Sequence, residues 1–319
     1  MVHSPLSIES TRGQVVENRH DVSLVVVDAA GAVIRRHGDI DVPVPARSSL
    51  KPLQALALLR SGAAGAFDVA DEEVALACAS HNGEPRHVEF VAGWLNRLGL
   101  DEDALGCAPA LPRLREDDGI PPATSRIAHN CSGKHTGFLT VAAHLGVAPG
   151  SYLDFDAPVQ QAVLGAIADA CRFELTPALV ARDGCSAPAA CLPLAALAGG
   201  LARTFLDSPD DAASRILFCM GAFPWLVGGT DRFDTNVAAL SAGQVLTKAG
   251  ADGMHVAVDR RNGITMAAKC HDGSRLPVEL TLVHALVDVG GLSEEQAEEL
   301  VDRVVVDDGG MPVGEFRPT

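Results

Sequence analysis

The distribution of apolar residues divides the chain into two β-rich ends and a helical middle. Near the N-terminus, the β-branched run 22–27 and the apolar segment 32–36 flank a turn-like stretch, which predicts a hairpin. Near the C-terminus, the apolar segments 253–258 and 264–269 flank Asn262-Gly263, and Asn-Gly between apolar runs is a strong hairpin signal. We therefore expect a hairpin at each end.

The middle of the chain is rich in Ala and Leu at helical spacing. Helices are expected near 48–60, 71–79, 87–98, 134–145, 158–171 and 191–206, then over 277–289 and after the capping-box pattern at Ser293. This order predicts an α+β fold: one antiparallel sheet, built from N- and C-terminal hairpins, with a large helical insertion. We expect a single catalytic domain over 1–319, with a β-rich lobe of about 15–46 plus 230–319 and a helical lobe of about 47–229.

Composition and charge narrow the class of protein. The chain has 319 residues, of which 47% are hydrophobic, enough for a substantial core. Its 25 basic and 41 acidic side chains give a net charge of −16, which repels nucleic acid backbones and anionic membrane surfaces, so neither partner is expected. We find no secretory leader pattern in residues 1–8 and no membrane-span pattern later, so we expect a cytoplasmic protein. Eight irregularly spaced cysteines favour thiolate or metal chemistry over disulfides.

Lysine is scarce, which singles out each one for inspection. The four lysines are Lys51, Lys134, Lys248 and Lys269. Ser48 and Lys51 are three positions apart, so on a helix they share a face. Leucines surround most sides of the segment 50–59, so we expect a buried helix, and burial lowers a lysine pKa toward neutrality. A neutral Lys51 can take the proton of Ser48. The alternative is a helix-capping serine beside a lysine whose amine reaches solvent.

Two further motifs follow in a meaningful order. Ser80-His81-Asn82 has the form Ser-x-Asn, and Lys248-Ala249-Gly250 has the form Lys-x-Gly. Penicillin-recognising serine hydrolases use Ser-x-x-Lys, Ser-x-Asn and Lys-Thr/Ser-Gly in this order, although here Ala249 replaces the hydroxyl residue. By this order Lys248 is the partner of Ser80. The alternative is an ordinary turn and a glycine loop.

Two polar, glycine-punctuated stretches, 128–137 and 183–188, interrupt the helical middle and look like loops that meet at a site. Cys131 and Cys185 with a third nitrogen donor would suit tetrahedral Zn²⁺. The paired CxxC signature of a structural zinc domain is absent, and the alternative is two small buried apolar cysteines.

Five separated stretches carry a resemblance to a known family: RSSLKPLQALALLRSG, ACASHNGEPRH, HNCSGKHTGFL, RDGCSAP and TKAGADG. Together they resemble the L-asparaginase II family of Rhizobium etli type, which is similar in fold to serine β-lactamases and penicillin-binding proteins. The resemblance implies hydrolysis of L-asparagine to L-aspartate and ammonia by two Ser-Lys pairs, Ser48 with Lys51 and Ser80 with Lys269. It also implies a homodimer and a zinc ion bound by Cys131, Lys134 and Cys185.

From these residues we expect an acyl-enzyme mechanism with Ser48 as nucleophile. Asp183 and Arg47 are the charged candidates for the substrate's ammonium and carboxylate, with Asn82 and His135 as further hydrogen-bond partners. The alternatives are a glutaminase, which differs by one methylene in its substrate, a β-lactamase-like serine hydrolase, and a non-catalytic protein that binds an amino acid or zinc.

Overall fold

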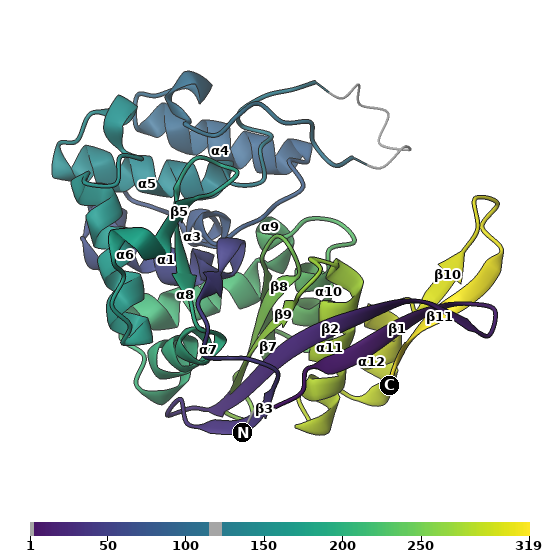
Figure 1. Ribbon diagram of the computed structural model, residues 1–319. Helices are drawn as coiled ribbons and strands as arrows, with labels where there is room; N and C mark the ends of the chain where they lie inside the picture. The colour runs from purple at the N-terminus through teal and green to yellow at the C-terminus, as the bar shows by residue number, and fades with distance from the viewer. Residues whose placement is uncertain (1–2, 115–122) are drawn as a thin grey trace.

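One eight-stranded antiparallel sheet joins the two ends of the chain in the computed structural model, which describes residues 3–114 and 123–319 (Figure 1). Seven strands follow the order β10-β11-β1-β2-β9-β8-β7, and β3 pairs with β2 beside this path. Their bounds are β1 (Leu6–Arg12), β2 (Val15–Asp28), β3 (Val33–His37), β7 (Val245–Ala249), β8 (Met254–Asp259), β9 (Ile264–Cys270), β10 (Val304–Val306) and β11 (Pro312–Pro318).

The central strands are buried on both faces, which explains their continuous apolar runs. Val25 and Val27 of β2 point into the larger core with the helical body, while Leu24 and Val26 point into a second core. Helix α7 (Leu194–Ala202) packs on β2 and β9, and α11 (Arg275–Asp288) contributes to the second core. Because successive strand side chains alternate between faces, one strand serves both cores.

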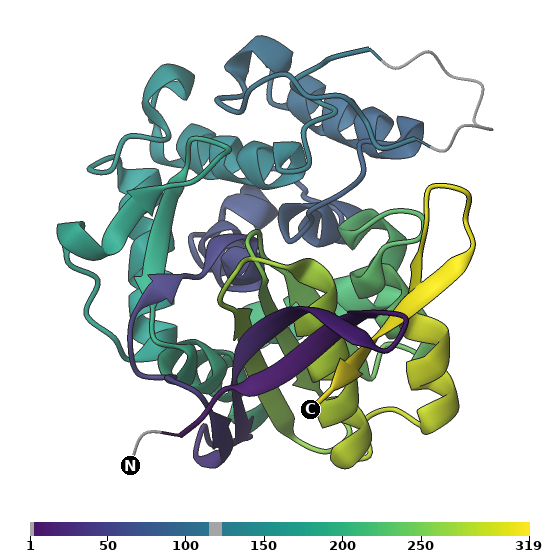
Figure 2. The ribbon, with the colours of Figure 1, turned by 45° about the vertical axis from the view of Figure 1, so that its right-hand side comes forward.

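The helical body is arranged around α1 (Lys51–Arg60), which contacts α3, α5, α6 and α8 (Figure 2). Every residue of α1 from Lys51 to Leu58 is buried, as the surrounding leucines predict. The remaining helices are α2 (Ala63–Ala66), α3 (Asp71–Ala77), α4 (Pro85–Arg97), α5 (Ser132–Leu145), α6 (Pro158–Cys171), α8 (Asp211–Ala222), α9 (Pro224–Val227), α10 (Phe233–Leu240) and α12 (Glu294–Leu300).

The expected α+β architecture and both hairpins are confirmed. The capping box is also confirmed, because Ser293 Oγ accepts from the Gln296 N–H and the Gln296 side chain accepts from the Ser293 N–H. The pattern missed β1, β7, β10 and β11. It also placed the start of α1 too early, since a 3₁₀ turn, η1 (Arg47–Leu50), precedes Lys51.

A small second sheet was not expected. Its order is β4 (Val44–Pro45), β6 (Pro188–Leu192) and β5 (Val180–Arg182), and β6 takes residues predicted to begin a helix at 191. Pro193 explains the later helix start, because the residue before a proline is held in extended conformation. The β5–β6 hairpin brings the 183–187 loop toward the chain that leads into η1.

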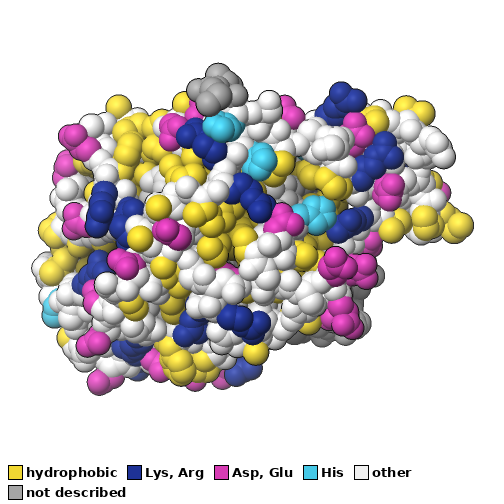
Figure 3. Space-filling view, turned by 90° about the horizontal axis from the view of Figure 1, so that it is seen from below, with side chains coloured by type: hydrophobic (Ala, Val, Ile, Leu, Met, Phe, Trp, Pro, Cys, Tyr) yellow, Lys and Arg dark blue, Asp and Glu magenta, His cyan; other side chains and the backbone are white. Residues whose placement is uncertain are grey.

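Charged side chains of both signs are interspersed over the face seen in Figure 3, with no single large basic patch on that face. Within the described residues, no helix is both long and apolar enough to cross a membrane. The hairpin of β10 and β11 projects from one side of the sheet (Figure 1).

Candidate active site

Lys51 is held inside the helical body at the first residue of α1. Its side chain is buried, and Nζ donates to Ala79 O, to Ser80 Oγ at 3.0 Å and to Asn130 O at 3.5 Å. A buried ammonium needs such acceptors, because desolvation without them costs several kcal/mol. Lys51 therefore connects the loop after α3 with the loop before α5.

Ser80 follows α3 in a loop that is fixed on both sides. Its backbone N–H donates to Val227 O at 2.9 Å, and its side chain is buried. Gly83, with φ of 72°, permits the close approach of the next loop, since an added Cβ would lie 2.4 Å from Ala128 O. This approach places Ser80 beside the segment that carries Asn130.

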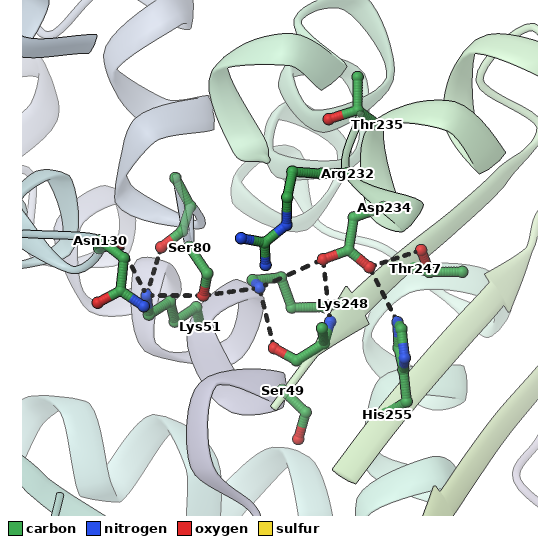
Figure 4. A network of polar contacts seen from close by, with 12 residues as sticks. Ser49, Lys51, Ser80, Asn130, Arg232, Asp234, Thr235, Thr247, Lys248 and His255 are labelled. Atoms are coloured by element: carbon green, nitrogen blue, oxygen red, sulfur yellow. Dashed lines mark hydrogen bonds and ion pairs between the residues drawn. The ribbon is translucent and has the colours of Figure 1, made fainter. Parts of the chain in front are cut away.

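Lys248 is the second amine on Ser80. It extends from β7, is buried, and donates from Nζ to Ser80 Oγ at 2.9 Å and to Ala249 O at 3.0 Å. Burial lowers the pKa of Lys248 to about 8, the charge of Lys51 adds to that effect, and the carboxylate of Asp234 opposes it. One serine oxygen thus accepts from two lysines (Figure 4).

Asp234 supports Lys248 from behind. Its carboxylate lies 3.5 Å from Lys248 Nζ and 2.9 Å from His255 Nε2, and it accepts from Thr247 Oγ1 at 2.8 Å and from the Ala249 N–H at 3.1 Å. Burial would raise the pKa of Asp234, but Lys248, His255 and these donors hold it well below its usual range. Sequence analysis missed Asp234 and His255. The available signal was a histidine within the apolar strand β8, where an unpaired polar residue is rare.

The expected pairing of Ser80 with Lys269 is not what the structure shows. Lys269 Nζ donates to Cys270 O, while Lys248 occupies the position beside Ser80. Lys269 is on β9 and Lys248 is on β7, and β8 lies between these two strands. Because neighbouring strands are about 4.8 Å apart, the two lysines are separated by two strand spacings. The motif order that nominated Lys248 agrees with this geometry, whereas the residue carried over by resemblance does not.

Ser48 lies apart from this hydrogen-bonded row. It is partly exposed on η1, and among the described residues its hydroxyl makes no hydrogen bond, including none to Lys51. The neighbouring Ser49 is buried and donates to Ala46 O at 2.5 Å. The turn η1 leads directly into α1 at Lys51, and the three-residue spacing alone does not produce a hydrogen bond between Ser48 and Lys51.

The residue before Ser48 is held in a strained conformation. Arg47 has φ of 52°, in the left-handed region, which costs on the order of 1 kcal/mol for a residue with a side chain. Its guanidinium donates to Asp183 Oδ1 at 2.9 Å and to Asp252. Arg47 and Asp183, expected to bind the two charged groups of a substrate, are thus neighbours.

The other two expected substrate contacts have protein partners. Asn82 donates to Glu84 at 3.0 Å and to Thr230 O at 3.0 Å, and accepts from Arg232 at 3.2 Å. His135 is buried, with Nδ1 2.5 Å from the Tyr152 hydroxyl and Nε2 without a hydrogen-bond partner among the described residues. Their roles toward substrate stay predictions.

Cys131, Lys134 and Cys185 meet in one buried cluster. Lys134 Nζ lies 2.9 Å from Cys185 Sγ, and the two thiols share a hydrogen bond. The hydrogen bond from Cys185 and the charges of Lys51 and Lys134 hold the pKa of Cys131 well below its usual range. Burial would lower the pKa of Lys134, but the charges of Cys185 and Cys131 outweigh it and raise that pKa. Two sulfurs and one nitrogen are a donor set that suits a tetrahedral zinc site.

The family model for L-asparaginase II matches residues 8–318 of this chain. The chain belongs to the L-asparaginase II family. Membership places it among the asparaginase-type amidohydrolases, in agreement with the resemblance seen in its five motifs. A search of curated proteins found no match to this chain.

Solved structures similar to this L-asparaginase II family member include two β-lactamases by title. A Mycobacterium bovis β-lactamase is 16% identical, with a TM-score of 0.45 over 85% of this chain and 95% of its own. A provisionally assigned β-lactamase from Bacteroides dorei DSM 17855 is 12% identical, with a TM-score of 0.46 over 84% of this chain and 93% of its own. Both scores are low, so the fold description rests on the chain's own sheet and helices.

Proposed function

We propose that the protein hydrolyses the side-chain amide of L-asparagine to L-aspartate and ammonia through an acyl-enzyme. The observation that supports this most is Ser80 Oγ, which accepts from two buried lysine amines, Lys51 and Lys248. Like charges this close disfavour each other, and the pKa of Lys248 is lowered to about 8, so an amine that can accept a proton lies beside Ser80.

Ser48 is our proposed nucleophile. Its hydroxyl is partly exposed and free of protein hydrogen bonds among the described residues, so it is available to a substrate carbonyl. Ser80 is buried and held between two amines, which suits a group that passes protons. We assign Lys51 as the base that takes the Ser48 proton, and Ser80 with Lys248 as the relay that protonates the departing ammonia.

The bonds and protons of the proposed reaction balance. Ser48 Oγ attacks the amide carbon, the carbon–nitrogen bond breaks, and the nitrogen leaves as ammonia with the proton delivered by the relay. Water then attacks the ester, which releases aspartate and returns the proton to Ser48. Each proton moves between groups of the row in Figure 4 and the attacking or leaving atom.

The charged ends of the amino acid need their own contacts. We propose that Arg47 binds the α-carboxylate and Asp183 the α-ammonium, with Asn82 and His135 as further partners. The ion pair between Arg47 and Asp183 supports this, because a zwitterion presents the complementary pair of charges. Glutamine carries the same two charges on a chain one methylene longer, so a site of this kind discriminates by only about 1–3 kcal/mol.

Zinc and a homodimer, both implied by the resemblance, belong to the same proposal, as does a cytoplasmic location. Cys131, Lys134 and Cys185 would hold the zinc ion, which when bound would supply a fixed positive charge beside the site. The lysine must be neutral to bind metal, so metal affinity should rise with pH. Elemental analysis and light scattering on purified protein test the metal and the dimer.

The deciding experiment measures ammonia release and traps the intermediate. Wild-type protein, Ser48→Ala and Ser80→Ala are each mixed with asparagine, glutamine or nitrocefin, and quenched samples are digested for mass spectrometry. We expect ammonia from asparagine and an acyl group on the peptide that contains Ser48. An acyl group on the Ser80 peptide would overturn the nucleophile assignment. Cleavage of nitrocefin without release of ammonia from asparagine would favour a β-lactamase-like hydrolase. Binding of asparagine without turnover would favour a non-catalytic protein.

A further inference from the structure

A second group of metal-binding side chains lies at the end of β9, outside the residues assigned above. His20 of β2 has Nδ1 2.5 Å from Asp272 Oδ2, and the Cys270 thiol donates to Asp272 Oδ1 at 3.1 Å. The ligand atoms of all three residues lie within 4.8 Å of one another. A nitrogen, a sulfur and a carboxylate oxygen therefore lie close together.

The backbone holds these residues in place. Val22 is the cross-strand partner of Cys270, and the His271 N–H donates to Asp21 O at 2.9 Å, so the turn after β9 is fixed to β2. The Cys270 N–H also donates to Gly253 O at 2.8 Å. Donors that are fixed before a metal arrives lose little conformational freedom when they bind it.

The cluster is open to solvent on one side. His20 and Cys270 are buried, whereas the side chain of Asp272 is 43% exposed. A metal ion can therefore enter past Asp272, and water can fill the remaining position. Three protein ligands and one water is a common arrangement for zinc.

The two contacts to Asp272 need only a small adjustment to fit a bound metal ion. In a tetrahedral zinc site, bonds of about 2.0–2.3 Å place neighbouring ligand atoms about 3.2–3.7 Å apart. The two contacts to Asp272 are 2.5 and 3.1 Å, so its carboxylate must move outward by up to about 1 Å. The exposed side of Asp272 leaves room for that movement.

The protons also balance. In the metal-free cluster the Cys270 S–H donates to Asp272 Oδ1, and His20 Nδ1 lies beside Asp272 Oδ2. When a metal binds, the thiol proton leaves to solvent, and His20 binds the metal through Nδ1 with a proton on Nε2. His20 Nε2 has no hydrogen-bond partner among the described residues, so a proton there breaks no existing hydrogen bond.

We propose that His20, Cys270 and Asp272 form a second binding site for a divalent transition metal of the zinc type, one that joins β2 to the turn after β9. This site is separate from Cys131, Lys134 and Cys185 and does not depend on the proposed amidase activity. Since it joins β2 to the turn after β9, bound metal should raise thermal stability.

Cobalt titration tests the site, because a Co²⁺–thiolate bond has its own near-ultraviolet absorption. The double variant Cys131→Ser/Cys185→Ser removes the thiols of the other cluster. We expect the double variant to bind one equivalent of Co²⁺ with thiolate absorption and to melt at a higher temperature when Zn²⁺ is present. When Cys270→Ser is added to the double variant, the bound Co²⁺ and its thiolate absorption should both disappear. His144→Ala, a change at an exposed histidine, is the matched control and should alter none of these.

A second experiment tests the site even if the double variant does not fold. Asp272→Asn in the otherwise wild-type chain should reduce bound metal by one equivalent, while circular dichroism shows an unchanged fold. Absence of Co²⁺–thiolate absorption in a folded double variant, or its persistence after Cys270→Ser, would overturn the proposal. An unchanged metal count in Asp272→Asn would overturn it equally.

Discussion

Lys51 and Lys248 share one hydrogen-bond acceptor, since their Nζ atoms lie 3.0 and 2.9 Å from Ser80 Oγ. They reach it from opposite parts of the fold, one from the first residue of α1 and the other from β7. Like charges this close disfavour each other, and the charge of Lys51 contributes to the lowered pKa of Lys248. The chemistry we propose depends on this pair.

Removal of the Lys248 amine tests its role directly. We expect Lys248→Met to lower kcat by roughly 10²–10⁴-fold, the usual worth of a positioned proton-transfer group. Lys248→Arg should fail as well, because a guanidinium stays protonated. The matched control is Lys269→Met, whose amine contacts Cys270 O rather than Ser80 and which should keep most activity. Equal losses in both methionine variants, measured by ammonia release, would contradict the assignment.

Asp234 should set the pH at which Lys248 can accept a proton within the proposed relay. The pKa of Lys248 is lowered to about 8, and its neutral form grows as pH rises, so kcat should increase through this range. The Asp234 carboxylate raises the pKa of Lys248, and Asp234→Asn should therefore move the rising limb of the pH–rate profile to lower pH. A purely structural role for Asp234 would lower the rate without moving the limb. A full profile for both proteins distinguishes the two.

The thiol cluster predicts a specific metal loss. Cys131→Ser or Cys185→Ser should reduce bound zinc by one equivalent, because each change removes a thiolate ligand. Cys191→Ser is the control, since Cys191 is a partly buried cysteine of β6 outside the cluster. Elemental analysis after gel filtration gives the count. Equal zinc in all three variants would refute a site at these thiols.

Packing around α1 should dominate the stability of the helical body. Leu56 is fully buried in the larger core, so Leu56→Ala should lower the free energy of unfolding by about 2–5 kcal/mol. Leu145 at the end of α5 is 43% exposed, and Leu145→Ala should change the free energy of unfolding by less than about 1 kcal/mol. Urea denaturation of both variants checks the difference. Similar losses would mean that α1 is not central to the core.

His87 should make stability depend on pH. Burial lowers the pKa of His87 to about 4, and its Nε2 lies 3.1 Å from Trp225 O with the ring stacked on Trp225. The unfolded chain binds this proton near pH 6.5 and the folded chain does not, so stability should fall as pH drops from about 6.5 to 4, by up to about 3 kcal/mol. His87→Gln should flatten that part of the profile. An unchanged slope in urea titrations would count against a neutral buried His87.

The sequence by itself determined several local elements and the family. Asn262-Gly263 between apolar runs gave the β8–β9 hairpin, leucines on all sides gave a buried α1, and Ser293 with Gln296 gave the start of α12. These signals act over a few residues, where propensity and periodicity decide. The five motifs added the L-asparaginase II family, which the comparison confirmed.

Only the tertiary structure decided which residues meet. Lys248 and Ser80 are 168 positions apart, and their contact depends on where β7 lies in the sheet relative to the loop after α3. Asp234 and His255 entered the site the same way, through α10 and β8. Strand order and register are set by burial of the whole sheet on two cores, so only the folded chain could decide between Lys248, which the motif order nominated, and Lys269, which the resemblance implied.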